Sequence, residues 1–558
     1  MQEILEGEIQ TTTMDHHGLV AAICQDLKIA ERINSRLLPD PQRKVSPGIA
    51  AMAMIINGLG FTNRTLYLAH RFFESKPIER LLGVDLKAVD ITDHALGNAL
   101  DDIAEYGASK LFAEVAFEIA LENNLLNLTN HIDTTTLSVH GAYAIDDDPN
   151  VIEVTHGFSK DHRPDLKQVV LSLVVNGPSS IPLWMDPLDG NSSDKVSFHE
   201  TIKKVEEFRS QINLNGCFKW VADSALYTKE RLLKSNDYFW VTRVPETITE
   251  AKRLVEMPSE DVVWIDASNG YRISRFESLY GGIKQRWLLV FSEQAYNREK
   301  KTLEKKILRE NGKLKQALWH LGNQVFHCEK DATRALEVLR KGYKLHNIAG
   351  TVVPVNKHTK PGKPKEGAEK ILVGYKVEAF FEQDHVEVEK ILNRKGRFIL
   401  ATNDLDADGY KDEQILDEYK AQQDVEGGFR FLKDPWFMVD SIFLKLPRRI
   451  EALMMIMTLT LLVYNVGQYR LRQQLKAEET TLPDQLGKQV QNPTLRWVFQ
   501  IMEGIGLVHF YNKSLSQIVR EVITNIKAVR KKIIYLFGAT AAKIYGLIPK
   551  TYSGGLGM

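Results

Sequence analysis

Apolar residues recur at helical spacing through roughly the first 125 residues. The segments SPGIAAMAMIINGLG (46–60) and ASKLFAEVAFEIALENNL (108–125) both show this period. Ser46 followed by Pro47 is a favourable helix start, and Asp93 before the periodic run ALGNALDDIAEY indicates a second capped helix. The pattern predicts a helical N-terminal domain over residues 1–125.

The pattern then changes to that of strands. NHIDTTTLSV (130–139) is rich in β-branched residues, and the apolar runs QVVLSLVVNG (168–177) and IPLWMDPLDG (181–190) follow at hairpin spacing. A helical stretch at 198–212 precedes two further strand-like runs, FKWVADSAL (218–226) and YFWVTRV (238–244). Strands interspersed with helices indicate an α/β core.

Residues 246–395 interrupt this rhythm. They hold a charged helical stretch at 297–323 and a strand-like run at 371–381, and we interpret them as an insertion. The core resumes with RFILATND (397–404) and a helix over 412–433. The predicted domains are therefore 1–125, a core in two parts (126–245 and 396–470), the insertion at 246–395, and a helical, basic C-terminal region at 471–558.

The most apolar run, EALMMIMTLTLLVYNV (451–466), is about 15 apolar residues long. A bilayer-spanning helix needs roughly 20, so a buried core helix is expected here and no membrane partner. Cys24, Cys217 and Cys328 fit neither a disulfide framework nor zinc spacing. With the polar, acidic N-terminus, which does not resemble a signal peptide, they favour a cytoplasmic protein.

Lys+Arg and Asp+Glu are equal at 72, so net charge does not indicate DNA binding. The distribution is more informative. Residues 491–558 hold nine Lys/Arg against two Glu, a net of +7, and residues 298–315 hold eight against three, a net of +5. Each cluster fits either a nucleic-acid contact or a solvated helix face.

Four polar residues share one face of the helix predicted at 412–433. Tyr419, Gln422, Glu426 and Lys433 are offset by 0, 3, 7 and 14 residues, which at about 100° per residue falls within an arc of about 60°. On DNA, Glu can hold a metal, Lys can meet a phosphate and Tyr can stack on a base. The alternative is a solvated polar face.

Gly427 and Gly428 lie inside the same predicted helix, where each costs about 1 kcal/mol relative to Ala. Close approach of another backbone or of DNA is one explanation, and a local kink is the other.

Two aspartates stand at strand-like segments. Asp133 lies within HIDTTTL, although Asp is depleted in strands, and Asp223 lies where an apolar strand ends and a helix begins. A surface acid and an N-cap are the respective alternatives. Together with Glu426 they can meet at one sheet edge and form an oxygen-only site suited to Mg²⁺ or Mn²⁺, including a two-metal site.

A strand Asp, a second strand Asp, a long insertion and Y-x2-R-x3-E-x6-K together resemble the insertion-sequence-4-like group of bacterial DDE transposases. Tyr419, Gln422, Glu426 and Lys433 stand at that spacing, with Gln422 where the signature has Arg. Further resemblance lies in HGFSKDHRPDLKQVVLSLVV, IPLWMDPLDGNSSDK and FILATND, so the likeness covers roughly residues 125–470.

The resemblance implies a ribonuclease-H-like α/β core, a largely β insertion and cut-and-paste chemistry. Asp133, Asp223 and Glu426 would be catalytic and hold two Mg²⁺ or Mn²⁺ ions, and Tyr419, Gln422 and Lys433 would bind DNA. The partners would be terminal inverted repeats and target DNA, bound by a homodimer. The N-terminal domain would recognise the ends or support dimerisation, and the basic C-terminal region would support DNA binding or assembly.

Two other functions fit the same core: a ribonuclease-H-like nuclease without strand transfer, such as a junction resolvase, and an inactive, transposase-derived DNA-binding protein. Some apparent metal sites are better explained otherwise. DLDADG (404–409) opens like a calcium loop, but its twelfth position is Ile415 rather than Glu, so we expect a turn. The pair His327-Cys328 lacks a second pair at zinc spacing. Four more histidines are expected to be ordinary polar or core residues: His16, His17, His156 and His162.

Overall fold

The computed structural model describes residues 9–61, 68–141, 143, 151–177, 179–214, 216, 218–234, 238–358, 369–434, 444–512 and 517–547; Cys217 lies outside them. The chain divides into two compact units, residues 1–240 with 418–558, and residues 241–417. The divisions fall within strand β6 (Phe239–Val244) and helix α14 (Asp412–Lys420).

The first unit is built around α16 (Pro447–Ala477), a 31-residue helix. Residues 454–463 of α16 are buried at every position, as expected of the middle of a core helix. Among the described residues it alone has the length and composition to cross a bilayer, and most of its apolar stretch is buried in the protein. The interpretation of 451–466 as part of a buried core helix is confirmed.

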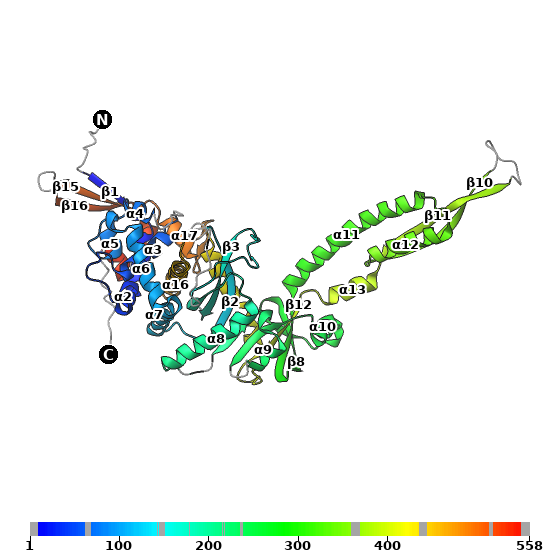
Figure 1. The fold of residues 1–558 in the computed structure, drawn as a ribbon, viewed down its shortest axis with the longest axis horizontal. Coiled ribbons are helices and arrows are strands. Elements are labelled where there is room, and N and C mark those ends of the chain that lie inside the picture. The colour runs from blue at the N-terminus through cyan, green and yellow to red at the C-terminus, as the bar shows by residue number, and fades with distance from the viewer. Residues whose placement is uncertain are drawn as a thin grey trace, which may run out of the picture. The chain divides into compact units, whose positions relative to one another are not determined.

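Helices from both ends of the chain pack against α16 (Figure 1). The N-terminal ones are α1 (His17–Asp26), α2 (Ile29–Leu37), α3 (Pro47–Gly58), α4 (Ala69–Phe73), α5 (Ile78–Leu82), α6 (Asp93–Tyr106) and α7 (Ala108–Glu122); the C-terminal ones are α17 (Leu495–Ile501), α18 (Ala528–Leu536) and α19 (Ala539–Ile544). Of these, α1, α3, α6, α7, α17 and α18 contact α16 directly.

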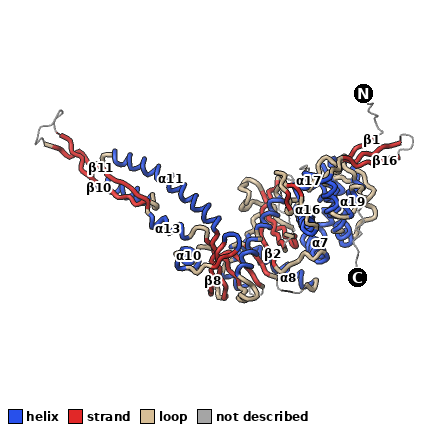
Figure 2. Tube along the Cα trace, turned by 180° about the vertical axis from the view of Figure 1, so that it is seen from behind, coloured by secondary structure: helices blue, strands red, loops and turns tan. Residues whose placement is uncertain are grey.

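The two ends also share a sheet. Strand β1 (Ile9–Thr13) pairs antiparallel with β15 (Gly506–Asn512), which pairs with β16 (Gln517–Thr524); β1 and β16 lie together in Figure 2. Both terminal regions therefore contain strands as well as the predicted helices. Some of the cations in the basic C-terminal region make contacts within the protein. Arg496 forms an ion pair with Asp434 (2.6 Å), and Arg530 donates to the carbonyl of Ile501 (2.8 Å).

The first unit also contains a mixed sheet in the order β4 (Ile181–Leu188), β3 (Lys167–Asn176), β2 (Thr129–Val139), β5 (Lys219–Ala222). Strand β3 pairs antiparallel with both β2 and β4, and β2 pairs parallel with β5. Helix α8 (Asp194–Gln211) covers one face, where Ser172 Oγ and Thr201 Oγ1 lie 3.3 Å apart; α9 (Lys229–Lys234) follows β5. The predicted α/β class is confirmed.

In the second unit, β6, β12 (Arg397–Thr402), β9 (Ile283–Ser292), β8 (Tyr271–Tyr280) and β7 (Ile265–Ala267) form antiparallel pairs in that order. Helices α11 (Glu293–Asn323) and α12 (Glu329–Gly342) lie along the hairpin of β10 (His346–His358) and β11 (Lys370–Gln383) (Figures 1 and 2). Helices α10 (Thr249–Glu256) and α13 (His385–Asn393) complete the unit.

The inserted segment differs from the largely β insertion implied by the resemblance. Its longest element is the helix α11, which buries Leu303, Ile307 and Leu314. The rest of α11 is rich in Lys, Glu, Leu and Gln, which favour helices. Packing of one narrow apolar stripe against the rest of the unit is therefore enough to hold the helix in place. The insertion is mixed α and β.

The structure explains two of the apparent metal motifs, the turn at 404–409 and the adjacent His16 and His17. Asp406 Oδ1 accepts hydrogen bonds from the backbone N–H of Asp408 (3.1 Å) and Gly409 (2.9 Å), which is a turn. Cys24 is buried, and Cys328 is exposed and not disulfide-bonded. His16 and His17 are core residues, stacked with ring centroids 4.4 Å apart.

The buried histidines predict a pH-dependent stability. Burial lowers the pKa of His16 to about 4 and that of His17 well below 6.5. In the unfolded chain both protonate near pH 6.5, so between pH 6.5 and 4 the unfolded state binds more protons and stability falls as pH falls. We expect the melting temperature to drop by several degrees from pH 7 to pH 5, as measured by calorimetry.

The His16→Gln variant keeps an N–H donor for the carbonyl of Leu59, to which His16 Nε2 donates at 2.7 Å, but it cannot titrate. Its melting temperature should depend less on pH than that of the wild type. The His94→Gln variant, at an exposed position of α6, serves as the control. Equal pH dependence in wild type and His16→Gln would contradict the assignment.

Candidate active site

The parallel register between β2 and β5 brings two of the predicted acids to the same place. The last Cα partners described for the two strands are His131 in β2 and Val221 in β5. Asp133 lies two residues after His131, and Asp223 lies two residues after Val221. The backbone of Asp223 is still extended (φ −71°, ψ −176°). Because residues in register on adjacent parallel strands point to the same face, the two aspartates project from neighbouring positions at the end of β5.

Each aspartate is held by a backbone hydrogen bond. Asp133 Oδ1 accepts from the N–H of Thr134 (2.7 Å), and Asp223 Oδ1 accepts from the N–H of Ala225 (2.8 Å), where it caps the short helix Ser224–Leu226. Asp133 is half-buried, with a side chain 20% exposed. The capping role raised for Asp223 is thus present, and it fixes the orientation of this carboxylate.

Glu426 belongs to α15 (Gln423–Leu432), which packs against β2, β3 and α16. A methyl group on Gly428 would lie 3.1 Å from Cδ2 of Leu461 in α16 and 3.9 Å from Cδ2 of Leu173 in β3. Leu173 pairs directly with Asp133, and directly opposite residues of antiparallel strands share a face. Helix α15 therefore covers the face that carries Asp133. Glu426 is exposed and lies about 200° around the helix from Gly428, so it is on the side of α15 away from this contact.

Carboxylate oxygens are the donors that Mg²⁺ and Mn²⁺ prefer, and the register of β2 and β5 brings two carboxylates, those of Asp133 and Asp223, to neighbouring positions. Within the described part of the chain, no three His, Cys, Asp or Glu side chains are already grouped closely enough to hold a metal ion. The chemistry of the donors fits the ions, and Glu426 is the exposed member of the three predicted acids.

The signature residues do not share one helix. The helix predicted at 412–433 consists of α14 and α15, separated by a turn in which the N–H of Gln422 donates to the carbonyl of Tyr419 (3.2 Å), three residues back. Gln422 is the buried N-cap of α15, whereas Glu426 is exposed. The expectation that these residues line one face of a continuous helix is wrong, because the tight turn changes their angular relation.

Lys433 ends α15, and its ammonium pairs with Asp161 Oδ1 at 2.7 Å. The neighbouring Lys160 reaches β2 instead. Lys160 Nζ donates to the carbonyl (2.7 Å) and hydroxyl (2.9 Å) of Thr134 and lies 3.9 Å from Asp133 Oδ1. The sequence prediction included the motif HGFSKDHR but assigned no role to Lys160 or Asp161. The only feature of the sequence that pointed to them is the adjacent pair of opposite charges in Ser-Lys-Asp.

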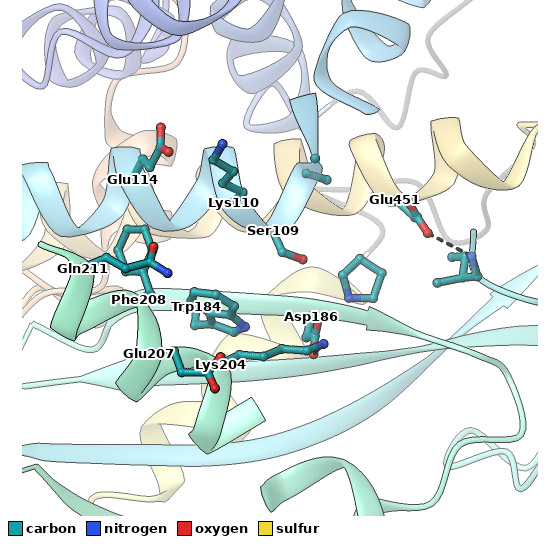
Figure 3. Close-up of a pocket in the computed structure, with 14 residues that line it drawn as sticks. Ser109, Lys110, Glu114, Trp184, Asp186, Lys204, Glu207, Phe208, Gln211 and Glu451 are labelled. Atoms are coloured by element: carbon teal, nitrogen blue, oxygen red, sulfur yellow. Dashed lines mark hydrogen bonds and ion pairs between the residues drawn. The ribbon is translucent and has the colours of Figure 1, made fainter. Parts of the chain in front are cut away.

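A cavity of about 540 Å³ lies elsewhere in the first unit, between the start of α7, β4, α8 and α16 (Figure 3). Neither the predicted acids nor the signature residues line it. Its central charges are engaged, since Lys204 Nζ lies 2.7 Å from Asp186 Oδ2 and Glu451 Oε1 accepts from the N–H of Ile152 (2.9 Å). Burial raises the pKa of Asp186, and the Lys204 ammonium opposes this.

Three comparisons with known proteins bear on the chain. A family model described as a domain of unknown function, DUF4277, matches residues 9–117, which contain none of the three acids. No curated protein matches the sequence. A cryo-EM structure of the piggyBac transposase synaptic complex with hairpin DNA is similar over 88% of this chain and 82% of that chain, with 10% identity and a TM-score of 0.35. A likeness at that score supports no structural or functional conclusion.

The two glycines of α15 predict opposite effects of substitution. A methyl group on Gly427 meets nothing within 4 Å, so Gly427→Ala should stabilise the protein by about 0.5–1 kcal/mol through helix propensity. Gly428→Leu should destabilise it by about 1–3 kcal/mol, because the side chain would push α15 away from Leu461 and Leu173. Chemical denaturation of both variants measures this, and equal stabilities would contradict the packing of α15 described above.

Proposed function

We propose that this protein is a DDE-type transposase that cleaves and joins DNA strands with Asp133, Asp223 and Glu426. The observation that supports this most directly is the parallel register of β2 and β5, which sets Asp133 beside Asp223 although 90 residues separate them. Helix α15, which carries Glu426, covers the same sheet face. Two strand aspartates and a helical glutamate are the arrangement that the sequence resemblance implies.

Asp133, Asp223 and Glu426 would together hold two Mg²⁺ or Mn²⁺ ions. Bound ions would supply activation of the attacking oxygen and stabilisation of the leaving oxygen. The strand backbone fixes the two aspartates through Thr134 and Ala225, so these ligands are positioned before DNA arrives. Hydrolysis would release a 3′-hydroxyl, which then attacks a second phosphodiester; no covalent protein–DNA bond is required.

Helix α11 offers a surface for the DNA backbone. Opposite its buried stripe, Arg298, Lys301, Lys305 and Arg309 project within an arc of about 80°. All four are exposed, and in the described part of the chain no ion pair involves them. The acids of this helix lie outside that arc. The four cations, called the α11 stripe below, therefore present unbalanced positive charge that fits a phosphate backbone.

Several finer assignments belong to the same proposal. The protein would be of the insertion-sequence-4-like group, would act on double-stranded DNA with terminal inverted repeats, and would work as a homodimer in the cytoplasm. Tyr419 and Lys433 would contact DNA near the acids; Gln422, buried at the start of α15, is the weakest of the three predicted contacts.

Conversion of each acid to its amide tests the chemistry. We expect Asp133→Asn, Asp223→Asn and Glu426→Gln to lose several kcal/mol of transition-state stabilisation, on the order of 10³-fold in rate. Binding of DNA from the flanks of the coding region should change little, because affinity comes mainly from phosphate contacts. Cleavage and joining are followed on labelled DNA in Mg²⁺.

The Asp408→Asn variant, at an exposed acid of the DLDADG turn, is the matched control and should remain active. Normal cleavage by Asp223→Asn would refute the assignment. Cleavage without joining in the wild type would identify a nuclease, and DNA binding without Mg²⁺-dependent cleavage would identify a binding protein.

Neutralising the α11 stripe should flatten the salt dependence of DNA binding. Replacing Arg298, Lys301, Lys305 and Arg309 by Gln should reduce the slope of log K against log salt by up to about 0.9 for each phosphate that is no longer neutralised. The control replaces Lys330 and Arg334, two exposed cations that share a surface depression with Glu329 and Glu337. The control should leave the slope unchanged. If the substitutions in α11 change the slope no more than the control does, α11 does not contact phosphate.

A further inference from the structure

The loop at residues 155–160 presents one aromatic side chain to solvent. Phe158 is 85% exposed, more than any other phenylalanine or tryptophan in the described part of the chain, whereas the next residue, Ser159, is buried. Single exposed apolar side chains are common on protein surfaces, so the exposure of this ring is not informative alone. Its backbone support and its position give it a meaning.

The chain that enters residue 158 is fixed against the ends of two strands. Thr155 and Gln168 of β3 exchange two backbone hydrogen bonds (2.9 and 3.3 Å). The buried Gln168 side chain donates through Nε2 to the carbonyls of Phe158 (3.2 Å) and Gly190 (2.7 Å). A methyl group on Gly157 would lie 2.1 Å from the carbonyl oxygen of Gly190. The backbone before the ring is therefore closely packed and hydrogen-bonded.

The chain that leaves residue 158 is held as well. Ser159 Oγ accepts a hydrogen bond from the N–H of Arg163 (3.1 Å), and the N–H of Lys160 donates to Thr136 Oγ1 in β2 (3.2 Å). The backbone is thus fixed on both sides of Phe158, and the fold itself holds the ring out in water. A contact made by a side chain on a fixed backbone costs less ordering entropy than one made by a loose loop.

This loop lies beside the candidate active site. Lys160 forms an ion pair with Asp133 (3.9 Å), and Asp161 pairs with Lys433 at the end of α15 (2.7 Å). The Cα atoms of residues 158 and 160 are at most about 7 Å apart, which is about two steps of duplex DNA. A strand with a phosphate at Asp133 would therefore pass the ring of Phe158 within a few nucleotides.

The chemistry of the ring limits what it can bind there. Phenylalanine offers a flat π face but neither charge nor a hydrogen-bonding group. Every nucleobase has a complementary flat face, so an aromatic ring next to a DNA strand can stack on a base whatever the sequence. No other large apolar side chain of the stretch 151–177 is exposed, so this segment offers no broader apolar patch of the kind that marks a protein partner.

We propose that Phe158 is a base-stacking residue, whose ring packs on a nucleobase within a few nucleotides of the phosphate held at Asp133. The inference rests on the proposed function, because that function places the phosphate at Asp133. The contact is non-covalent and independent of sequence. It would hold the DNA strand in register with the acids and would not select which sequence is bound.

Three substitutions at one position separate stacking from other effects. Phe158→Ala removes the ring, Phe158→Leu keeps an apolar side chain without an aromatic face, and Phe158→Trp keeps the aromatic face. The matched control is Phe380→Ala, since Phe380 is 66% exposed and belongs to β11 of the second unit. All four variants should keep the wild-type melting temperature, because substitutions at exposed positions change stability little.

The first measurement is binding of DNA from the flanks of the coding region, in EDTA so that no strand is cut. Phe158→Ala and Phe158→Leu should weaken binding about tenfold, whereas Phe158→Trp and Phe380→Ala should bind as the wild type does. The second measurement repeats the titration with DNA that lacks one base at a time. At one or two positions the missing base should weaken wild-type binding but have no further effect on Phe158→Ala.

The coupling between ring and base does not depend on cleavage. Independent effects of Phe158→Ala and the missing base at every position overturn the inference, and cleavage by the wild type in Mg²⁺ would then leave the proposed function intact. Coupling in a wild type that cuts no DNA supports the stacking contact and refutes the transposase. A drop of several degrees in the melting temperature of Phe158→Ala also overturns the inference, because the ring would then serve the fold. A wild type that binds none of this DNA overturns both proposals.

Discussion

The enclosure of α16 is the constraint on which the first unit depends. Residues 454–463 of this helix are buried at every position, because helices from both ends of the chain, together with β4 and α15, pack around them. Burial of so much apolar surface is the dominant favourable term in folding. The placement of α15, which carries Glu426, follows from it, because Leu461 of α16 and Leu173 of β3 meet α15 at Gly428, where even a methyl group would lie 3.1 Å from Leu461 Cδ2.

The sequence predicted what local pattern determines. The continuous apolar run at 451–466 could only be a membrane span or a fully buried helix, and its length favoured the second. The β-branched run around Asp133 predicted a strand, and the polar turn at 404–409 predicted a turn. The overall α/β class followed from the alternation of such segments.

What the sequence could not predict depends on long-range geometry or on small departures from ideal helices. The alignment of Asp133 with Asp223 is set by the register of two parallel strands, which no local pattern specifies. The break between Tyr419 and Gln422 carries no Gly or Pro signal, since Ala421 and its neighbours are good helix formers. The insertion was inferred to be largely β by resemblance, although its own charged run at 297–323 already had a helical pattern.

Charge around the candidate site is organised by elements from distant parts of the chain. Carboxylates come from β2, the end of β5 and α15, and the turn at Ser159 brings Lys160 to the first of them and Asp161 to Lys433.

The central claim is that Asp133, Asp223 and Glu426 hold divalent metal together. Its most direct test is anomalous scattering from crystals of the full-length protein soaked in Mn²⁺. The account predicts anomalous density within about 2.0–2.6 Å of carboxylate oxygens of both Asp133 and Asp223, with Glu426 turned toward the same ions. Density confined to other residues, with both aspartates unliganded at saturating Mn²⁺, would contradict it.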